Sequence, residues 1–427
     1  MAGSDATAVR AVLARHRVRV LQVDDLDGVV RELERAEADS TRVGRTAQSG
    51  RTILVRLDDV VGEAASLLHQ EFHSLGGEVT PGLETVRRPA PPSAVVLEGT
   101  LGQFGQLPAQ LDRQPFELPD IGRAVAAAIA NFGHRGSRTI QGPHHSVVLG
   151  GYPKVMGVVN VTPDSFSDGG RFLAPADAIA HAKQLVAEGA VVLDVGAEST
   201  RPGAAEVTPE AEWKRLEPVL AGLHGQLEVP VSVDTRHPEV AAKALDAGAD
   251  WVNDVGGLRD PEMRRVVART GAPVVVLHMR GDPTTMQTNT VYDDVRDEVY
   301  GALAAATEQA IADGVAPSQL LVDPGLGFGK SAEQSLELLE HVGEFRSLGY
   351  PVVVGASRKS FLGAVTGGRP VHDRVDASVA AAVLAAVRGA ELIRAHDVQP
   401  TVRALAVVAA ARRAHRPTTS VPALSDR

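Results

Sequence analysis

The sequence has 427 residues, 44% of them hydrophobic and 22% charged, which is the composition of an ordinary globular protein. Asp and Glu (53) outnumber Lys and Arg (43), and the net charge of −10 argues against nucleic acid or an anionic membrane surface as the main partner. No cysteine is present, which excludes disulfides, thiolate zinc sites and cysteine nucleophiles. Because the N-terminus has no apolar core of signal-peptide length, and no apolar run approaches the ~20 residues of a membrane span, we expect a soluble cytoplasmic protein.

Residues 1–135 predict a small α/β domain. Strand-like runs alternate with helix-like segments, and a Pro-rich break, RRPAPPS, interrupts them. The strand-like runs are RVRVLQV (17–23), TILVRL (52–57) and AVVLEGT (94–100), and the helix-like segments begin with 25–38 and 59–77. No catalytic constellation is visible in this region. Its role stays open: it could stabilise the remainder of the chain, mediate assembly or bind a separate ligand.

Two histidine pairs precede the region that carries the chemistry. His69 and His73 lie four residues apart on a predicted helix, a spacing that would allow both to bind a metal. No third ligand is evident, and an ordinary helix face explains the pair more simply. His144 and His145 are expected on the surface of a loop.

Eight short apolar runs follow one another from residue 154 onward, each ending in polar residues and separated by helix-length segments. They are KVMGVVNVT (154–162), VVLDVGAE (191–198), VSVDT (231–235), WVNDV (251–255), VVVLHM (274–279), LLVDPG (320–325), VVVGAS (352–357) and LIRAHD (392–397). Their Val, Ile and Leu content without alternation is typical of parallel strands buried on both faces. Eight such units over roughly 260 residues match a (β/α)8 TIM barrel. The alternative is an open doubly wound sheet, but no dinucleotide-binding fingerprint follows the first run.

We therefore predict an α/β fold in which a (β/α)8 TIM barrel at 136–415 follows the small α/β N-terminal domain at 1–135. A disordered C-terminal tail at 416–427 is expected after the barrel. The segment 135–154 contains Gly, Pro and short β runs. It is either a linker or a hairpin that closes the barrel floor.

The active site of such a barrel is built at the carboxyl ends of its strands, so the last polar residues of each run are the candidates. In chain order they are Asn160, Asp194, Asp234, Asn253, Asp254, His278, Asp323, Ser357, Arg358, Lys359, Arg394 and His396. A single strand-end Asp often only caps the next helix. That explanation does not account for eight polar strand ends with carboxylates on one arc and cations on another, so the pattern predicts a ligand site.

Several of these residues suit a flat, nitrogen-rich ring. Asp234, Asn253 and Asp323 offer acceptors and amide groups to a heterocycle with donor edges. Lys359 could lie among them or contact a carbonyl of that ring. The glycine-rich stretch DPGLGFGK (323–330) is not a Walker A loop, which requires GKS or GKT after a longer spacing. We interpret its glycines as allowing close approach to a flat ligand.

Other strand-end residues suit an anion. Arg394 and His396 lie two residues apart on the last strand and therefore point the same way. Together with Asn160 they could hold a phosphate or diphosphate, with a divalent ion bridging. The stretch GVVNVTPDSFSDGG (157–170) continues beyond Asn160 with polar residues and glycines, which predicts a mobile loop that closes over such an anion.

With these motifs in family order, the chain from about residue 138 to 415 resembles dihydropteroate synthase, a pterin-binding barrel of folate biosynthesis. The matching stretches are GVVNVTPDSFSDGG, DVGAESTRPGAAEV (194–207), VSVDT, VNDV (252–255), LHMRGDPTTMQ (277–287), DPGLGFGK, GASRKSFLG (355–363) and IRAHDV (393–398). Departures are small: Ala197 stands where glycine is usual, and Leu326 where an aromatic residue is common. The larger departure is the N-terminal domain, which compact members lack.

The resemblance implies a role for each matching position. Asn160 would coordinate Mg²⁺ on the pterin diphosphate, and Arg394 and His396 would bind the diphosphate itself. The implied pterin contacts are Asp234, Asn253, Met279, Asp323 and Lys359, and the implied p-aminobenzoate pocket is formed by Thr200, Arg201, Pro202, Phe328 and Ser357. The first mobile loop would carry Asp164, Ser165, Phe166 and Asp168. The implied catalytic residues are Asp234, Asp323, Lys359, Arg394 and His396.

The implied activity is that of a transferase. The amine of p-aminobenzoate attacks the methylene of 6-hydroxymethyl-7,8-dihydropterin diphosphate, diphosphate leaves and 7,8-dihydropteroate forms. Mg²⁺ is the implied cofactor, and two small molecules are the implied partners, with no nucleic acid and no membrane. Family members are commonly homodimers through helices on the outer face of the barrel, and we expect the same here. Whether the pterin becomes a free cation before the amine attacks stays open.

Two other readings compete with the synthase. One is a pterin-binding methyltransferase that acts on a reduced folate, against which the diphosphate and p-aminobenzoate stretches SRKS, STRPG and RAHD argue. The other is a pterin-binding barrel that has lost turnover, against which the presence of every expected functional position argues. A turnover assay distinguishes the second from the synthase.

Overall fold

The structure is a computed structural model that describes residues 26–36, 38, 40–81, 92–134, 136–161, 174–198 and 206–413. The chain divides into two compact units, one formed by Met1–Ala130 with Arg413–Arg427 and the other by Asn131–Arg412. The strand expected at 17–23 and the tail expected at 416–427 lie outside the described residues. The domain limits 1–135 and 136–415 stay predictions.

The N-terminal unit is a three-stranded antiparallel sheet with helices. Its elements are α2 (Leu26–Arg35), α3 (Ser40–Ser49), β1 (Thr52–Val60), α4 (Gly62–Ser74), β2 (Glu78–Pro81), β3 (Ser93–Thr100), α5 (Leu101–Leu111) and α6 (Leu118–Gly133). The strand order is β1-β3-β2, with β3 antiparallel to both neighbours. The buried residues Leu68 and Phe72 of α4, Phe104 of α5 and Leu97 of β3 belong to one core. Because this core is separate from those of the barrel, the unit has its own packing.

The histidine pair on α4 has a structural explanation. Nδ1 of His69 lies 3.2 Å from the backbone oxygen of Val79 on β2. Its ring also stacks on that of His73, with centroids 5.7 Å apart. Among the described residues, no group of three or more His, Cys, Asp or Glu side chains is placed to hold a metal ion. The described contacts of His69 therefore attach the helix to the neighbouring strand.

The second unit repeats strand and helix. Its strands are β4 (Arg138–Gln141), β5 (Ser146–Leu149), β6 (Lys154–Asn160), β7 (Val192–Gly196), β8 (Val231–Asp234), β9 (Trp251–Asp254), β10 (Val274–Leu277), β11 (Leu320–Asp323), β12 (Val353–Val354) and β13 (Leu392–Ala395). Its helices are α7 (Pro175–Ala187), α8 (Pro209–Leu223), α9 (Pro238–Asp246), α10 (Pro261–Thr270), α11 (Val295–Ala312), α12 (Ala332–Glu340), α13 (Ser360–Val365), α14 (Val375–Arg388) and α15 (Val398–Arg413). Short 3-10 turns span Pro317–Gln319, Val342–Leu348 and Val371–Asp373.

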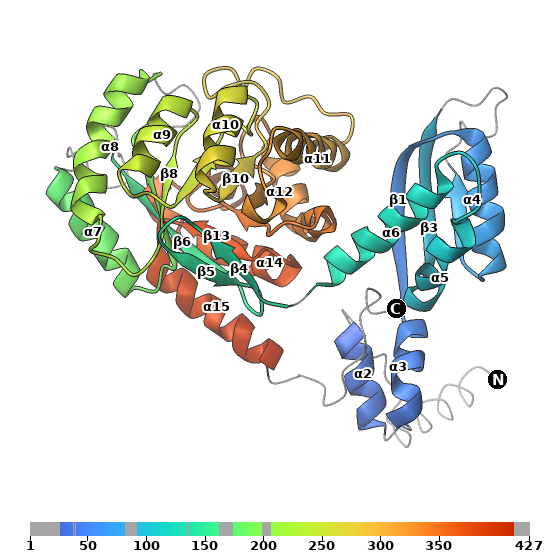
Figure 1. The fold of residues 1–427 in the computed structure, drawn as a ribbon. Helices are drawn as coiled ribbons and strands as arrows, with labels where there is room; N and C mark the ends of the chain where they lie inside the picture. Colours follow the sequence, from blue (N-terminus) through green and yellow to red (C-terminus); the bar gives the residue numbers. More distant parts are fainter. Residues whose placement is uncertain are drawn as a thin grey trace. The chain divides into compact units, whose positions relative to one another are not determined.

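Eight parallel strands of this unit form one closed sheet. Their order is β11-β10-β9-β8-β7-β6-β13-β12. A parallel bridge between Val322 of β11 and Val352 beside β12 joins the two ends of that order. The N–H of Val322 also donates to the carbonyl of Pro351 at 3.0 Å. The helices surround the strands (Figure 1). The predicted (β/α)8 barrel is therefore confirmed, and the open doubly wound sheet is excluded.

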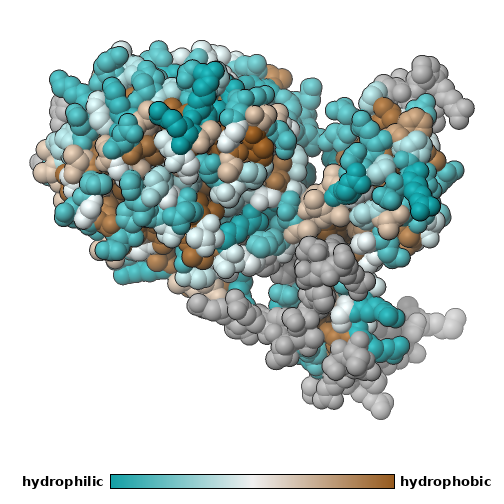
Figure 2. Space-filling model, in the orientation of Figure 1, coloured by the Kyte–Doolittle hydropathy of each residue, from teal (hydrophilic) through white to brown (hydrophobic). Residues whose placement is uncertain are grey.

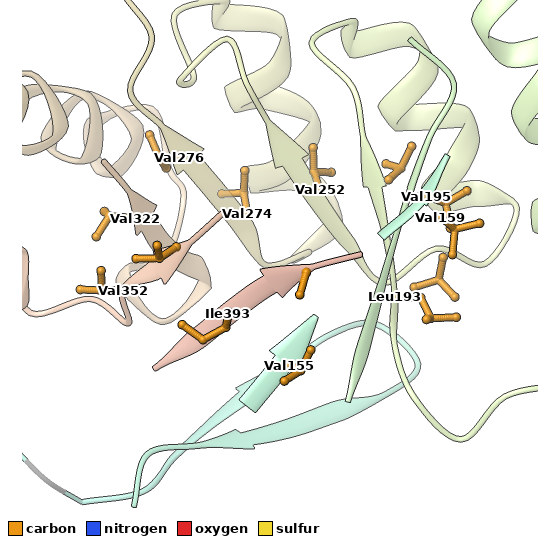
Figure 3. Packing of buried hydrophobic residues seen from close by; sticks show 14 of the residues in the cluster. Val155, Val159, Leu193, Val195, Val252, Val274, Val276, Val322, Val352 and Ile393 are labelled. Carbon is orange, nitrogen blue, oxygen red and sulfur yellow. The ribbon is translucent and has the colours of Figure 1, made fainter. Parts of the chain in front are cut away.

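Side chains along the barrel strands alternate between two cores. Val274 and Val276 of β10 and Val322 of β11 belong to the large outer cluster under the helices (Figure 3). Val275 and Leu321, which lie between or beside them in the sequence, belong to a separate inner cluster. Successive side chains of a strand point to opposite faces. The sequence position of a residue therefore decides whether it packs under a helix or inside the barrel.

The hairpin of β4 and β5 closes the amino-terminal end of the barrel. Its Leu149 packs in the inner cluster with Trp251 at the start of β9. Buried Asp250 accepts hydrogen bonds from the backbone N–H groups of His144 and His145, both at 2.8 Å, and lies 2.9 Å from Nδ1 of His145. Of the two alternatives for this segment, the hairpin is correct. His144 and His145 lie in the loop of this hairpin, exposed and partly exposed as expected, and the ring of His145 also contacts the buried carboxylate.

We expect Asp250→Ala to lower the free energy of unfolding of the barrel by about 2–3 kcal/mol, because two backbone N–H groups lose their acceptor. The measurement is urea unfolding followed by tryptophan fluorescence. Trp213 and Trp251 are the only tryptophans and both lie in the barrel unit, so the signal reports this unit alone. Asp246→Ala, an exposed carboxylate on α9, is the matched control and should change the free energy by at most about 0.5 kcal/mol. If Asp250→Ala and Asp246→Ala unfolded at the same urea concentration, Asp250 would not stabilise the hairpin as described.

Candidate active site

The polar strand ends lie directly above the inner core of the barrel. On five strands an inward residue is followed two positions later by a polar residue, which faces the same way. These pairs are Val192 and Asp194 on β7, Ser232 and Asp234 on β8, Trp251 and Asn253 on β9, Leu321 and Asp323 on β11, and Leu392 and Arg394 on β13. The register of the barrel therefore directs five polar side chains into its carboxyl end.

Arg394 connects two carboxylates in the middle of this group. Its Nε donates to Asp194 at 2.6 Å and its Nη2 donates to Asp234 at 2.7 Å. Nδ2 of Asn253 donates to the same oxygen of Asp194 at 3.0 Å. The structure thus brings together Asp234, Asn253 and Arg394, all expected in the site. It adds Asp194 as the residue that joins them.

Three oxygens of this network are buried without a partner. They are Oδ1 of Asp194, Oδ1 of Asp234 and Oδ1 of Asn253, and none has a hydrogen-bond partner among the described residues. Buried polar atoms are nearly always hydrogen-bonded, and leaving one unpaired is costly. Three unpaired acceptors in one network therefore indicate a ligand that presents several N–H or O–H donors.

The charges of the network influence one another. Burial raises the pKa of Asp234 to about 7, with Arg394 opposing and Asp194 reinforcing that change. Burial works against the charge of Arg394, but Asp194 and Asp234 outweigh it, so that its pKa is raised. Arg394 is therefore a permanent cation, whereas Asp234 exchanges its proton near neutral pH.

Asp323 and Lys359 form a second pair of opposite charge beside the network. Oδ1 of Asp323 accepts from the backbone N–H of Gly325 at 2.7 Å, and burial raises the pKa of this carboxyl while Lys359 opposes the change. Nζ of Lys359 donates to the carbonyl of Leu326 and lies 4.2 Å from the centroid of the Phe328 ring. Burial lowers the pKa of Lys359 to about 8, although Asp323 favours its charged form. Lys359 thus lies between a carboxylate and an aromatic ring.

An apolar wall adjoins Lys359. Phe328 and Met279, both expected in the site, belong to one buried cluster with Val255, Leu277 and Met286. Phe328 comes from the loop after β11, whereas Met279 follows β10. A flat ligand held by the carboxylates would have both polar and apolar surfaces available here, as heterocycle sites commonly do.

The glycines of the loop after β11 have a backbone role that the sequence did not indicate. Gly325, Gly327 and Gly329 have φ values of 67°, 79° and 63°, a region that favours glycine. A Cβ on Gly325 would lie 1.9 Å from the carbonyl oxygen of His278. These glycines serve left-handed turns, and Gly325 also serves close packing on the segment after β10. That they also allow close approach to a flat ligand stays a prediction.

Asn160 and His396 lie at the ends of their strands. Asn160 is partly exposed at the last position of β6, paired in register with Gly196 of β7. His396 lies beside Ser357, whose Oγ is 3.1 Å from Nδ1 of His396 and accepts from its backbone N–H at 3.2 Å. Arg394 and His396, which we expected to act together, therefore have different protein partners.

The loops expected over the site fall outside the described residues. Asp164, Ser165, Phe166 and Asp168 of the first loop, and Thr200, Arg201 and Pro202 of the second, are among them. The described flanks of the second loop are joined by Arg236. Its guanidinium contacts Glu198 at 3.2 Å and Glu206 at 2.6 Å, the residues on either side of 199–205. This contact was not expected from the sequence.

Asp194 is the main site residue that sequence reasoning left out of its candidate contacts. It is fully buried and accepts from both Arg394 and Asn253. It was noted as a strand end, but nothing local distinguishes it from a helix cap. The sequence signal that could have found it is the alternation of side-chain direction along β7. Asp194 lies two residues after inward-facing Val192 and therefore also faces inward.

Comparison with known proteins identifies the class. A family model described as "Pterin binding enzyme" matches residues 156–396, more than half of the chain. The chain therefore belongs to the pterin-binding enzyme family. The dihydropteroate synthase of Escherichia coli K12 is 46% identical over 262 residues, which is 61% of this chain and 92% of that protein. This relative confirms the resemblance found in the sequence.

Two further likenesses cover different parts of the chain. A probable bifunctional folylpolyglutamate synthase/dihydropteroate synthase of Haloferax volcanii is 40% identical over 411 residues, which is 92% of this chain but 47% of that protein. The match thus includes most of the N-terminal unit, while the chain spans about half the length of this relative. The solved dihydropteroate synthase of Xanthomonas albilineans in complex with 7,8-dihydropteroate has a TM-score of 0.58 and 42% identity, covering 64% of this chain and 99% of that one.

We expect the amine of Lys359 to titrate near pH 8, because burial outweighs the attraction of Asp323. The chain has six lysines, so protein grown with ¹³C-lysine gives few Cε resonances to follow by NMR. Lys359→Arg assigns the resonance by removing it. Asp323→Asn should move the midpoint below 8, since the attraction that keeps the proton on is lost. A midpoint near the ordinary value of ~10.4 would contradict the buried environment of this amine.

Proposed function

We propose that this protein is a dihydropteroate synthase. It would join p-aminobenzoate to 6-hydroxymethyl-7,8-dihydropterin diphosphate and release diphosphate. The observation that carries the proposal is the set of three unpaired, buried acceptors on Asp194, Asp234 and Asn253 around Arg394. The family and its relatives support the same activity.

The pterin ring matches this set of acceptors. Its amino group and ring N–H groups are donors, and they would satisfy the unpaired oxygens of Asp194, Asp234 and Asn253. Lys359 would donate to the ring carbonyl, because its amine lies beside Asp323 at the edge of the same group. The ring would then occupy the barrel mouth above the inner core, with Met279 against its face.

The displacement requires charge stabilisation more than base catalysis. A C–N bond forms between the aryl amine and the pterin methylene, the C–O bond to diphosphate breaks, and the amine then loses a proton to solvent. An aryl amine is already a nucleophile. The carboxylates of Asp234 and Asp323 would stabilise positive charge on the pterin, while Arg394 and His396 would stabilise the leaving anion. The p-aminobenzoate roles of Phe328 and Ser357, and of Thr200, Arg201 and Pro202, stay predictions.

The residues present offer Mg²⁺ one protein ligand. Mg²⁺ commonly takes one or two protein oxygens and completes its shell with phosphates and water. The amide oxygen of Asn160, a residue partly exposed at the end of β6, would be one such ligand. When bound there with the diphosphate, Mg²⁺ would neutralise part of the leaving charge.

The predicted homodimer and cytoplasmic location belong to the same proposal. Apolar and polar residues are interspersed over the visible face of the barrel unit in Figure 2, and we assign no dimer surface on it. Within the described part of the chain, no helix has the length and apolarity to cross a membrane. Small-molecule substrates are supported by the solved relative that holds 7,8-dihydropteroate.

The test of the proposed activity is diphosphate release by the purified chain with dihydropterin diphosphate and Mg²⁺. Release should depend on p-aminobenzoate and yield dihydropteroate. Lys359→Ala should lower kcat/KM by at least about 100-fold, because a cation at the ring is lost. Lys214→Ala, an exposed lysine on α8, is the matched control and should leave turnover unchanged. Pterin binding without any product would leave the non-catalytic barrel as the better reading.

We expect Asn160→Ala to raise the Mg²⁺ concentration for half-maximal rate by about tenfold, because one oxygen ligand is removed. Asn289→Ala, an exposed asparagine after β10, is the control. Binding of Mn²⁺ in the presence of inorganic diphosphate, followed by electron paramagnetic resonance, measures the same site without turnover. If both variants required the same Mg²⁺ concentration as the unmodified protein, Asn160 would not be a ligand.

A further inference from the structure

Lys330, the last residue of the glycine-rich loop after β11, is a buried lysine of the barrel, and burial lowers the pKa of its amine well below the ordinary value. Its side chain is enclosed, with the residue only 3% exposed. Its Nζ donates to the backbone carbonyls of Gly325 and Phe328, both at 3.0 Å, and lies 2.9 Å from Nδ1 and 3.3 Å from the carbonyl oxygen of His278. Burying a lysine is costly unless its N–H groups are paired. Here the hydrogen-bond partners are backbone carbonyls and an imidazole nitrogen. The amine therefore connects backbone segments, and no described carboxylate forms an ion pair with it.

His278 is in the state that this contact requires. Burial, with Lys330 and Arg280 close by, lowers the pKa of His278 to about 3. The ring is therefore neutral at ordinary pH and its Nδ1 can accept a hydrogen bond. The backbone N–H of His278 also donates to the carbonyl of Asp323 at 2.9 Å. Lys330 thus joins the segment after β10 to the loop after β11.

The loop that Lys330 holds carries two groups of the proposed site. The carbonyl of Leu326 accepts from Nζ of Lys359, and the Phe328 ring lies beneath the same amine. Three glycines make this backbone conformationally permissive. Without Lys330, the buried carbonyl of Phe328 would lose the one donor that the described residues give it, and that of Gly325 would keep only the backbone N–H of Phe328 at 3.0 Å. Lys330 therefore contributes to the shape of the loop at Phe328.

We propose that Lys330 is a positioning residue for the aryl-amine half of the site. This inference rests on the proposed function, in which Phe328 borders the p-aminobenzoate pocket. Lys330 contacts the carbonyl of Phe328 directly and sets where its ring lies. Asp194, Asp234, Asn253 and Arg394 lie on strands of the barrel and do not depend on this loop. Of the proposed pterin contacts, Lys359 and Met279 adjoin this loop and the four strand residues do not, so loss of Lys330 affects p-aminobenzoate more than the pterin.

The test compares Lys330→Met with Gln319→Met. Gln319 is the matched control because it too is buried and collects backbone carbonyls, donating to Val267 at 3.1 Å and Ala272 at 2.9 Å. It lies at the other end of β11, away from the site. Both substitutions remove a buried donor and lower the thermal midpoint, so a purely structural role would make them alike.

In the full-length protein, Lys330→Met should raise KM for p-aminobenzoate by about tenfold, while the dissociation constant for the pterin changes less than about threefold. Gln319→Met should change neither value. Lys330→Gln keeps two N–H donors and should recover part of the loss, and it also serves if the Met variant fails to fold. If the Met variants at 330 and 319 gave equal KM values, or if both substrates weakened equally, the positioning role would be overturned.

Two further readouts separate this inference from the proposed function. Equilibrium binding of p-aminobenzoate is measured in the presence of 6-hydroxymethyl-7,8-dihydropterin, which lacks a leaving group and does not react. Crystal structures of the two Met variants show whether the Phe328 ring has moved. If the wild-type protein showed no turnover, the proposed synthase activity would be refuted, but the positioning role of Lys330 would not. An unmoved Phe328 ring in Lys330→Met would refute the positioning role whether or not turnover occurs.

Discussion

The alternation of side chains along eight parallel strands is the constraint on which both the fold and the site depend. A strand that supplies Val192 or Leu392 to the inner core necessarily supplies Asp194 or Arg394 two positions later on the same face. A shift of one residue in either strand would place a charged group among the helices and an apolar one in the site. One register therefore specifies the packing and the chemistry, and the hairpin held by Asp250 closes the end of the barrel opposite the site.

Within that register the charges are arranged for a ligand more than for stability. A buried cation between two carboxylates recovers only part of its desolvation cost, and such groups are seldom a net source of stability. Asp194 and Asp234 each use one oxygen on Arg394 and keep the other unpaired. A ligand that donates to the unpaired oxygens satisfies atoms that the folded chain leaves unsatisfied. The donors and acceptors are already oriented before binding, which is the arrangement that favours charge stabilisation in a transition state.

The sequence predicted the barrel and most of the described site because the signals are local. Strand-length apolar runs end at Asp234, Asn253 and Asp323, and the barrel rule places such ends together. Contacts between distant residues carry no such signal. Arg394 reaches Asp194 across 200 positions, and Lys330 reaches His278 across 52. The packing role of Gly325 could not be predicted for the same reason, since the close carbonyl of His278 belongs to another strand-end segment.

The two halves of the proposed site differ in what supports them. Four of the groups proposed to face the pterin, Asp194, Asp234, Asn253 and Arg394, lie on strands whose register is shared with the core, so they cannot move without disturbing the barrel. Phe328 and the carbonyl that holds Lys359 lie on a glycine-rich loop, and the buried amine of Lys330 is the described donor to the Phe328 carbonyl. A displacement reaction places different requirements on the two halves of the site. The electrophilic carbon must be held rigidly against fixed charges while diphosphate departs, whereas the nucleophile must enter and the product must leave. The rigid strands on the pterin side and the hydrogen-bonded loop after β11 on the p-aminobenzoate side meet these two requirements.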